Sequence, residues 1–129
     1  MEGKSIAIKI LIVDDEELIL ELMAEALTGE GYECFVASSV EAAVQTIRAT
    51  PGIVLIITDL KMPGGNGFDL IETVQTQCGQ KLKFIIMSGH ADLSNNDRDV
   101  GAAALPFLAK PVSIESLLDK VRSVLEAKQ

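Results

Sequence analysis

Polar side chains that could carry out chemistry stand directly after three apolar runs of the chain. They are Asp14 and Asp15, Asp59, and Ser88. If the three runs are strands of one parallel sheet, their carboxyl ends share an edge and these side chains gather there, although they are far apart in the sequence. Carboxylates that meet in this way repel one another by several kcal/mol per close pair at an effective dielectric near ~20, so a positive group must join them.

The composition of this cluster favours a divalent cation together with a phosphoryl group. Mg²⁺ prefers hard oxygen ligands that leave room for water, as these carboxylates do. Lys110 follows the last short apolar run and adds a fixed positive charge. Each residue also has a simpler reading, because Asp14 or Asp15 could cap the next helix and Lys110 could be an ordinary solvated lysine. Because these residues occur together with Asp59, a site for a cation and a phosphoryl group is favoured over these simpler interpretations.

Five strands are predicted from the apolar runs. They are Ala7–Val13, Tyr32–Ala37, Ile53–Thr58, Lys83–Ser88 and Phe107–Ala109. Three of them are almost continuously apolar, which is typical of parallel strands that helices cover on both faces.

Amphipathic helical patterns separate the strands. The first covers about Leu18–Leu27, the second follows a capping box of Ser38 and Glu41, the third runs from Gly67 to about Cys78, and the last is capped by Ser113. The fourth crossover, Ala91–Val100, is so polar that it predicts either a short or mobile helix or a solvated loop.

Five βα units predict an α/β fold of one domain. The expected architecture is a flavodoxin-like, doubly wound (βα)5 three-layer sandwich, with a five-stranded parallel sheet in the order 2-1-3-4-5. We expect residues 7–128 to form this domain and residues 1–6 to be an N-terminal extension.

Composition excludes several classes of function. The chain has 129 residues, 48% of them hydrophobic, and a net charge of −8, which disfavours direct binding to nucleic acid or to an anionic membrane. Because no apolar run is long enough for a membrane span or a signal peptide, we expect a cytoplasmic protein. Cys34 and Cys78 have no metal-binding spacing and are expected to be reduced structural thiols.

From about Ile8 onwards, the chain resembles the receiver domain of two-component response regulators. The resemblance is carried by Asp14–Asp15, by Asp59 in TDLKMPGGNGFDL, by Ser88 in MSGH and by Lys110 in FLAKP, all in the order and spacing of that family. The longer stretch between Gly101 and Lys110 resembles receivers of hybrid histidine kinases.

The resemblance implies a role for each site residue. Asp59 is the expected phosphoacceptor, and Asp15, Asp59 and the Lys61 carbonyl are the expected direct Mg²⁺ ligands, with Asp14 acting largely through water. Lys110 is expected to contact the phosphoryl oxygens and to precede a cis peptide bond to Pro111. Ser88 and Phe107 take the switch positions, and His90 takes a rim position that influences loss of the phosphoryl group.

The predicted function is therefore regulatory rather than enzymatic. The domain would take a phosphoryl group with the help of Mg²⁺ and lose it again by autodephosphorylation. Since His90 is the only histidine, the donor must be a separate histidine kinase or histidine phosphotransfer domain, and the output passes to a downstream protein partner or a fused output domain. Two alternatives remain: an adaptor that is not phosphorylated, or a Mg²⁺-dependent phosphohydrolase, although the latter would need a second acid where this chain has Lys61.

Overall fold

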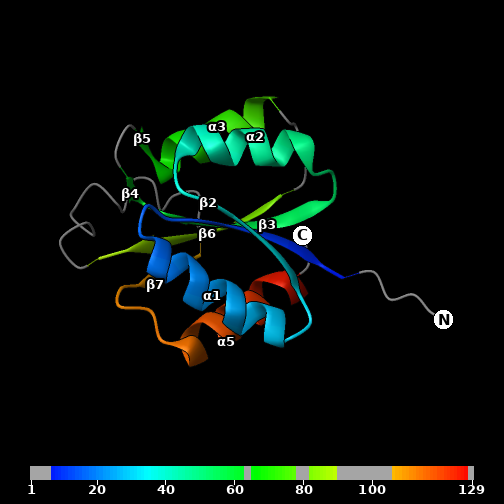
Figure 1. Ribbon diagram of the computed structural model, residues 1–129, viewed down its shortest axis with the longest axis vertical. Coiled ribbons are helices and arrows are strands. Elements are labelled where there is room, and N and C mark those ends of the chain that lie inside the picture. Colours follow the sequence, from blue (N-terminus) through cyan, green and yellow to red (C-terminus); the bar gives the residue numbers. More distant parts are fainter. Residues whose placement is uncertain (1–6, 63–64, 78–81, 90–105, 128–129) are drawn as a thin grey trace.

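A parallel sheet forms the centre of the molecule (Figure 1). The computed structural model describes residues 7–62, 65–77, 82–89 and 106–127. The strands of the sheet are β1 (Lys9–Val13), β2 (Glu33–Ala37), β3 (Ile53–Asp59), β6 (Lys83–Ser88) and β7 (Phe107–Ala109). Their order is β2-β1-β3-β6-β7, and all neighbouring pairs are parallel. The predicted strand order and flavodoxin-like architecture are confirmed.

Helices cover both faces of this sheet (Figure 1). Helices α1 (Glu17–Gly29) and α5 (Ile114–Glu126) lie on one face, and α2 (Val40–Ala49) and α3 (Gly67–Gln77) lie on the other. None of the helices in the described ranges is long and apolar enough to cross a membrane. The predicted element at Ala91–Val100 lies outside the described residues.

The apolar strands form two cores because their side chains alternate between the faces of the sheet. In β1, Leu11 and Val13 pack toward α2 and α3, whereas Ile10 and Ile12 pack toward α1 and α5. All four side chains are fully buried. This two-sided burial explains why β1 reads as a continuous apolar run, and it fixes the direction in which the residues just after the strand must emerge.

Two local features differ from the sequence-based expectation. The cap of α2 is Ser39, whose hydroxyl accepts a hydrogen bond from the backbone N–H of Ala42 at 3.1 Å, so the prediction of Ser38 was wrong by one residue. Two adjacent serines offer the same chemistry, and only the extended backbone of Ser39 decides between them. A small antiparallel hairpin of β4 (Lys61–Met62) and β5 (Gly65–Asn66) precedes α3 and was not predicted. The Ser113 cap of α5 is confirmed.

Candidate phosphoacceptor site

Three carboxylates meet at the carboxyl ends of β1 and β3. Asp14 and Asp15 follow β1, and Asp59 ends β3, its neighbour in the sheet. One carboxylate oxygen from each of the three residues lies within 4.8 Å of the others. Asp14 is fully buried and Asp59 is 5% exposed, whereas Asp15 is exposed. The predicted convergence is thus confirmed by the geometry.

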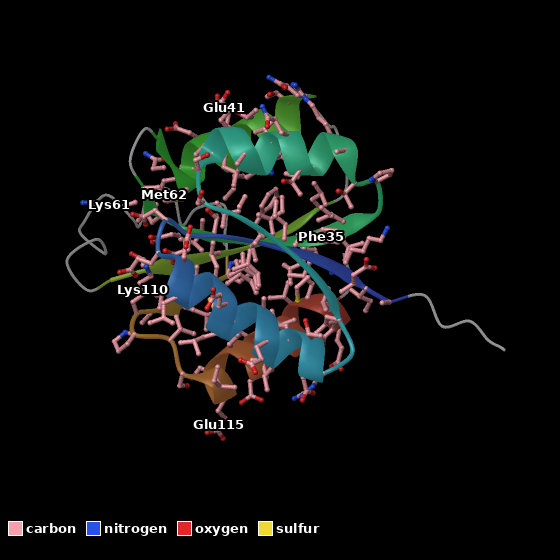
Figure 2. All side chains as sticks on the ribbon, viewed as in Figure 1. Phe35, Glu41, Lys61, Met62, Lys110 and Glu115 are labelled. Atoms are coloured by element: carbon pink, nitrogen blue, oxygen red, sulfur yellow. The ribbon has the colours of Figure 1, made fainter. Side chains whose placement is uncertain are left out.

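Lys110 supplies the positive charge of the cluster. Its Nζ lies 3.1 Å from Oδ2 of Asp59 and 3.2 Å from Oδ2 of Asp14. The backbone N–H of Lys110 donates to the carbonyl of Ser88 at 2.8 Å, which holds the lysine at the end of the β6–β7 pair. As predicted, the peptide bond to Pro111 is cis. Figure 2 shows Lys110 and Lys61 at the same end of the molecule, although they come from different elements.

The ion pairs with Asp59 and Asp14 keep Lys110 charged. Burial by itself lowers the pKa of Lys110, but the contacts with Asp59 and Asp14 outweigh this effect, so its pKa lies above the ordinary value. Burial raises the pKa of Asp59, and the negative charge of Asp14 adds to the rise. Lys110 and the backbone N–H of Lys61 offset it in part. The carboxylate of Asp59 is therefore held in a buried position at an electrostatic cost.

A small cation fits this set of ligands. Oδ1 of Asp14 accepts the backbone N–H of Glu16 at 2.9 Å. Oδ2 is buried, and no described donor makes an aligned hydrogen bond to it; Lys110 approaches it only as an ion pair. The Lys110 ammonium contacts two of the three carboxylates, so among these four described residues negative charge is in excess. Carboxylates at this spacing repel by roughly 3 to 4 kcal/mol per pair at an effective dielectric near 20, which a divalent cation would relieve.

Ser88 ends β6 next to the cluster, whereas Phe107 is the first residue of β7. The Ser88 side chain is fully buried, and its hydroxyl donates to the carbonyl of Gly89 at 3.3 Å. Phe107 is 44% exposed and pairs in register with Ile86. Ser88 thus ends its strand as predicted. His90 and Cys78 lie outside the described residues.

An apolar groove begins at the site and runs between α1 and α5. Its volume is about 610 Å³, and Lys110 and Glu16 lie in its wall. Its apolar lining includes Ile19, Leu22, Val112 and Ile114. Leu22 on α1 is 48% exposed and Ile114 on α5 is 45% exposed, so apolar side chains of both helices lie outside the buried core. This open surface was not predicted from the sequence.

Gly67 is a second feature that the sequence analysis missed. A Cβ at this position would lie 2.8 Å from the carbonyl oxygen of Asp59 and 3.2 Å from Cγ2 of Thr58. The backbone N–H of Gly67 also donates to the carbonyl of Leu60 at 2.8 Å. The run of glycines after Asp59 was a signal of close backbone approach, but the sequence does not indicate which glycine is in contact.

A doubly wound sheet with buried carboxylates and a lysine at its carboxyl edge defines an α/β protein that can hold a cation and an anionic group together. The chain belongs to the response regulator receiver domain family, whose model matches residues 10–122. It is therefore a regulatory receiver domain of the two-component type.

Relatives and solved structures agree with this assignment. The chain is 31% identical to the sporulation initiation phosphotransferase F of Bacillus subtilis, with 93% of this chain and 95% of the relative covered. It is 32% identical to the two-component response regulator PprB of Pseudomonas aeruginosa over 84% of this chain, but spans only 40% of that protein's length. A response regulator receiver domain from Clostridium thermocellum is 30% identical, with a TM-score of 0.80 and coverage of 92% and 94%.

Proposed function

We propose that Asp59 of this receiver domain accepts a phosphoryl group from a phosphohistidine of another protein. The observation that carries the proposal is the cluster itself, in which Asp14, Asp15 and Asp59 surround one point and Lys110 contacts two of them. If Asp14 or Asp15 only capped a helix, or if Lys110 were only a solvated lysine, these four residues would have no reason to lie close together.

The residues divide the chemistry among them. An oxygen of the Asp59 carboxylate attacks phosphorus in line as the bond between phosphorus and the donor's imidazole nitrogen breaks. The Lys110 ammonium, already 3.1 Å from Asp59, neutralises the charge on the phosphoryl oxygens. The Lys61 backbone N–H holds the acceptor carboxylate in place. The product is an aspartyl phosphate.

Mg²⁺ is the proposed cofactor. Asp15, Asp59 and the Lys61 carbonyl would hold it directly, and Asp14 would act largely through water. When bound, it lowers the repulsion between the acceptor carboxylate and the incoming phosphoryl group. The domain would then promote its own phosphorylation by a small donor and its own dephosphorylation, without acting as an enzyme on other substrates.

Phosphorylation would change the surface through Ser88 and Phe107. The new group brings about −1.5 to −2 charge and strong acceptor oxygens. The Ser88 hydroxyl, which now donates to Gly89, would turn toward these oxygens, and Phe107 would change its exposure on β7. His90 is proposed to affect the access of water to the aspartyl phosphate.

The receiver is proposed to act in the cytoplasm, and its phosphodonor to be a histidine kinase or histidine phosphotransfer domain that docks a helix on the groove between α1 and α5. The groove is continuous with Lys110, so an occupant would lie next to Asp59. The exposed acids Glu17, Glu21 and Glu25 flank the apolar side chain of Leu22 on α1. A helix with an apolar face and basic edges would complement this surface in both respects.

Intact-mass spectrometry after incubation with Mg²⁺ and acetyl phosphate tests the proposal. We expect one added phosphoryl group on the wild type and none on Asp59→Asn, or after removal of Mg²⁺ with a chelator. No addition to the wild type, under conditions that phosphorylate another receiver, would refute the proposal in favour of the adaptor function. Continuous release of phosphate from phosphate esters would favour the phosphohydrolase instead.

A further inference from the structure

The N-terminal end of α3 is closed by a reciprocal pair of hydrogen bonds between Asn66 and Asp69. The Asn66 side chain accepts the backbone N–H of Asp69 at 2.9 Å, and the Asp69 carboxylate accepts the backbone N–H of Asn66 at 3.2 Å. This arrangement satisfies N–H groups that a helix start leaves without partners. Both bonds are exposed.

This cap is connected to the phosphoacceptor through a short chain of backbone contacts. Asn66 is the last residue of β5 and pairs with Lys61 across the hairpin. Lys61 in turn bonds to the Asp59 carboxylate through its backbone N–H. On the other side of the cap, Gly67 donates to the carbonyl of Leu60 and packs against the carbonyl of Asp59.

The hairpin alone holds the Lys61 backbone weakly. Its strands β4 and β5 have two residues each, and isolated two-stranded hairpins are at best marginally stable in water. The cap attaches the end of this hairpin to α3, whose Leu70, Ile71 and Val74 are buried in the core. The rigidity of the helix is thereby transmitted to the loop next to Asp59.

We propose that Asn66 and Asp69 are positioning residues that hold the backbone of Lys61 against the acceptor site and thereby increase its affinity for a divalent cation. This inference rests on the proposed function, because it concerns the same cation site. Neither residue touches the reacting atoms. They act by reducing the conformational freedom that the loop would lose when the cation binds.

Titration calorimetry with Mg²⁺ on the full chain tests this role. In Asn66→Ala, which removes one acceptor without changing the net charge, we expect the Kd for Mg²⁺ to rise about three- to tenfold, as for the loss of a helix cap that is coupled to binding. Asn66→Ser keeps a capping oxygen and should restore most of the affinity. At saturating Mg²⁺, the rate at which acetyl phosphate phosphorylates Asn66→Ala should be within about twofold of the wild-type rate, because the cap affects only the binding of Mg²⁺.

Ser39→Ala provides the matched control. It removes the cap of α2, a neighbouring helix on the same face of the sheet, and should lower Tm to a similar extent without changing the Kd. If Asn66→Ala lowers Tm but binds Mg²⁺ like the wild type, the cap is only structural and the inference is wrong, while the proposed function stands. If the wild type binds Mg²⁺ but is not phosphorylated, the proposed function fails and the change in Kd still decides the inference. A wild type that binds no Mg²⁺ overturns both.

Discussion

Replacing Gly67 with alanine should destabilise the domain and impair its phosphorylation. The added Cβ would lie 2.8 Å from the Asp59 carbonyl oxygen, so the two must separate by 0.6 Å to reach the 3.4 Å at which ordinary van der Waals contact begins. Thr58 and Leu60 approach the same methyl group at 3.2 and 3.4 Å, so the residue has little room to move. All three neighbours belong to the chain segment around Asp59.

The magnitude follows from two opposing effects. Overpacking a site of this kind costs typically ~1–3 kcal/mol. Alanine is a better helix former than glycine by up to about 1 kcal/mol, but less in the first turn, where Gly67 lies. The steric clash should therefore outweigh the gain in helix propensity and lower the free energy of unfolding by roughly 1 to 2 kcal/mol. This corresponds to a decrease of about 3 to 10 °C in Tm for a domain of this size.

Thermal unfolding followed by far-ultraviolet circular dichroism measures the stability, and intact-mass spectrometry measures the rate of phosphorylation by acetyl phosphate. Because the displaced group is the Asp59 carbonyl, we expect the rate to fall by about tenfold or more. Gly29→Ala is the matched control, since Gly29 ends α1 and a Cβ there meets no atom within 4 Å. If Gly67→Ala is as stable and as active as Gly29→Ala, the steric argument is wrong.

Three further predictions concern other parts of the molecule. Asp59→Asn should raise Tm by a few degrees without Mg²⁺, because it removes a buried carboxylate. This increase in Tm should become smaller when Mg²⁺ is added. A lower Tm in both conditions would contradict the electrostatic account. Leu22→Ala should slow phosphoryl transfer from a phosphorylated histidine protein by about three- to tenfold and leave the rate with acetyl phosphate unchanged. If the variant matches the wild type with both donors, the donor does not dock on the groove. Burial raises the pKa of the Cys34 thiol, so less thiolate is present at pH 8; in Cys78→Ser, Cys34 should react with iodoacetamide more slowly than a model peptide thiol, and the reaction should accelerate as the pH rises. A rate equal to that of the peptide would show that Cys34 is not shielded.

The strands and the main site residues could be predicted because each depends on local sequence. A strand covered on both faces needs apolar side chains at every position, so β1, β3 and β6 stand out as runs that end in Asp14, Asp59 and Ser88. Parallel strands then have their carboxyl ends on one edge of the sheet, which brings these residues together. The assignment of Ser38 as a cap failed because neighbouring serines differ only in backbone conformation.

Residue types and their spacing were enough to predict the order of the elements, the carboxylate cluster with its lysine, and the family. The packing of the elements shows which buried oxygen of Asp14 has no aligned hydrogen-bond donor among the described residues, and which glycine approaches the Asp59 carbonyl. It also shows that Asn66 and Asp69 cap α3 beside the site. It also decided that Leu22 borders an open groove, because an apolar helical stripe has the same pattern whether a core or solvent lies against it. Residue type and periodicity indicate which side chains of a segment must be buried. Distances between segments, in contrast, are set only when the whole sheet and its helices pack together.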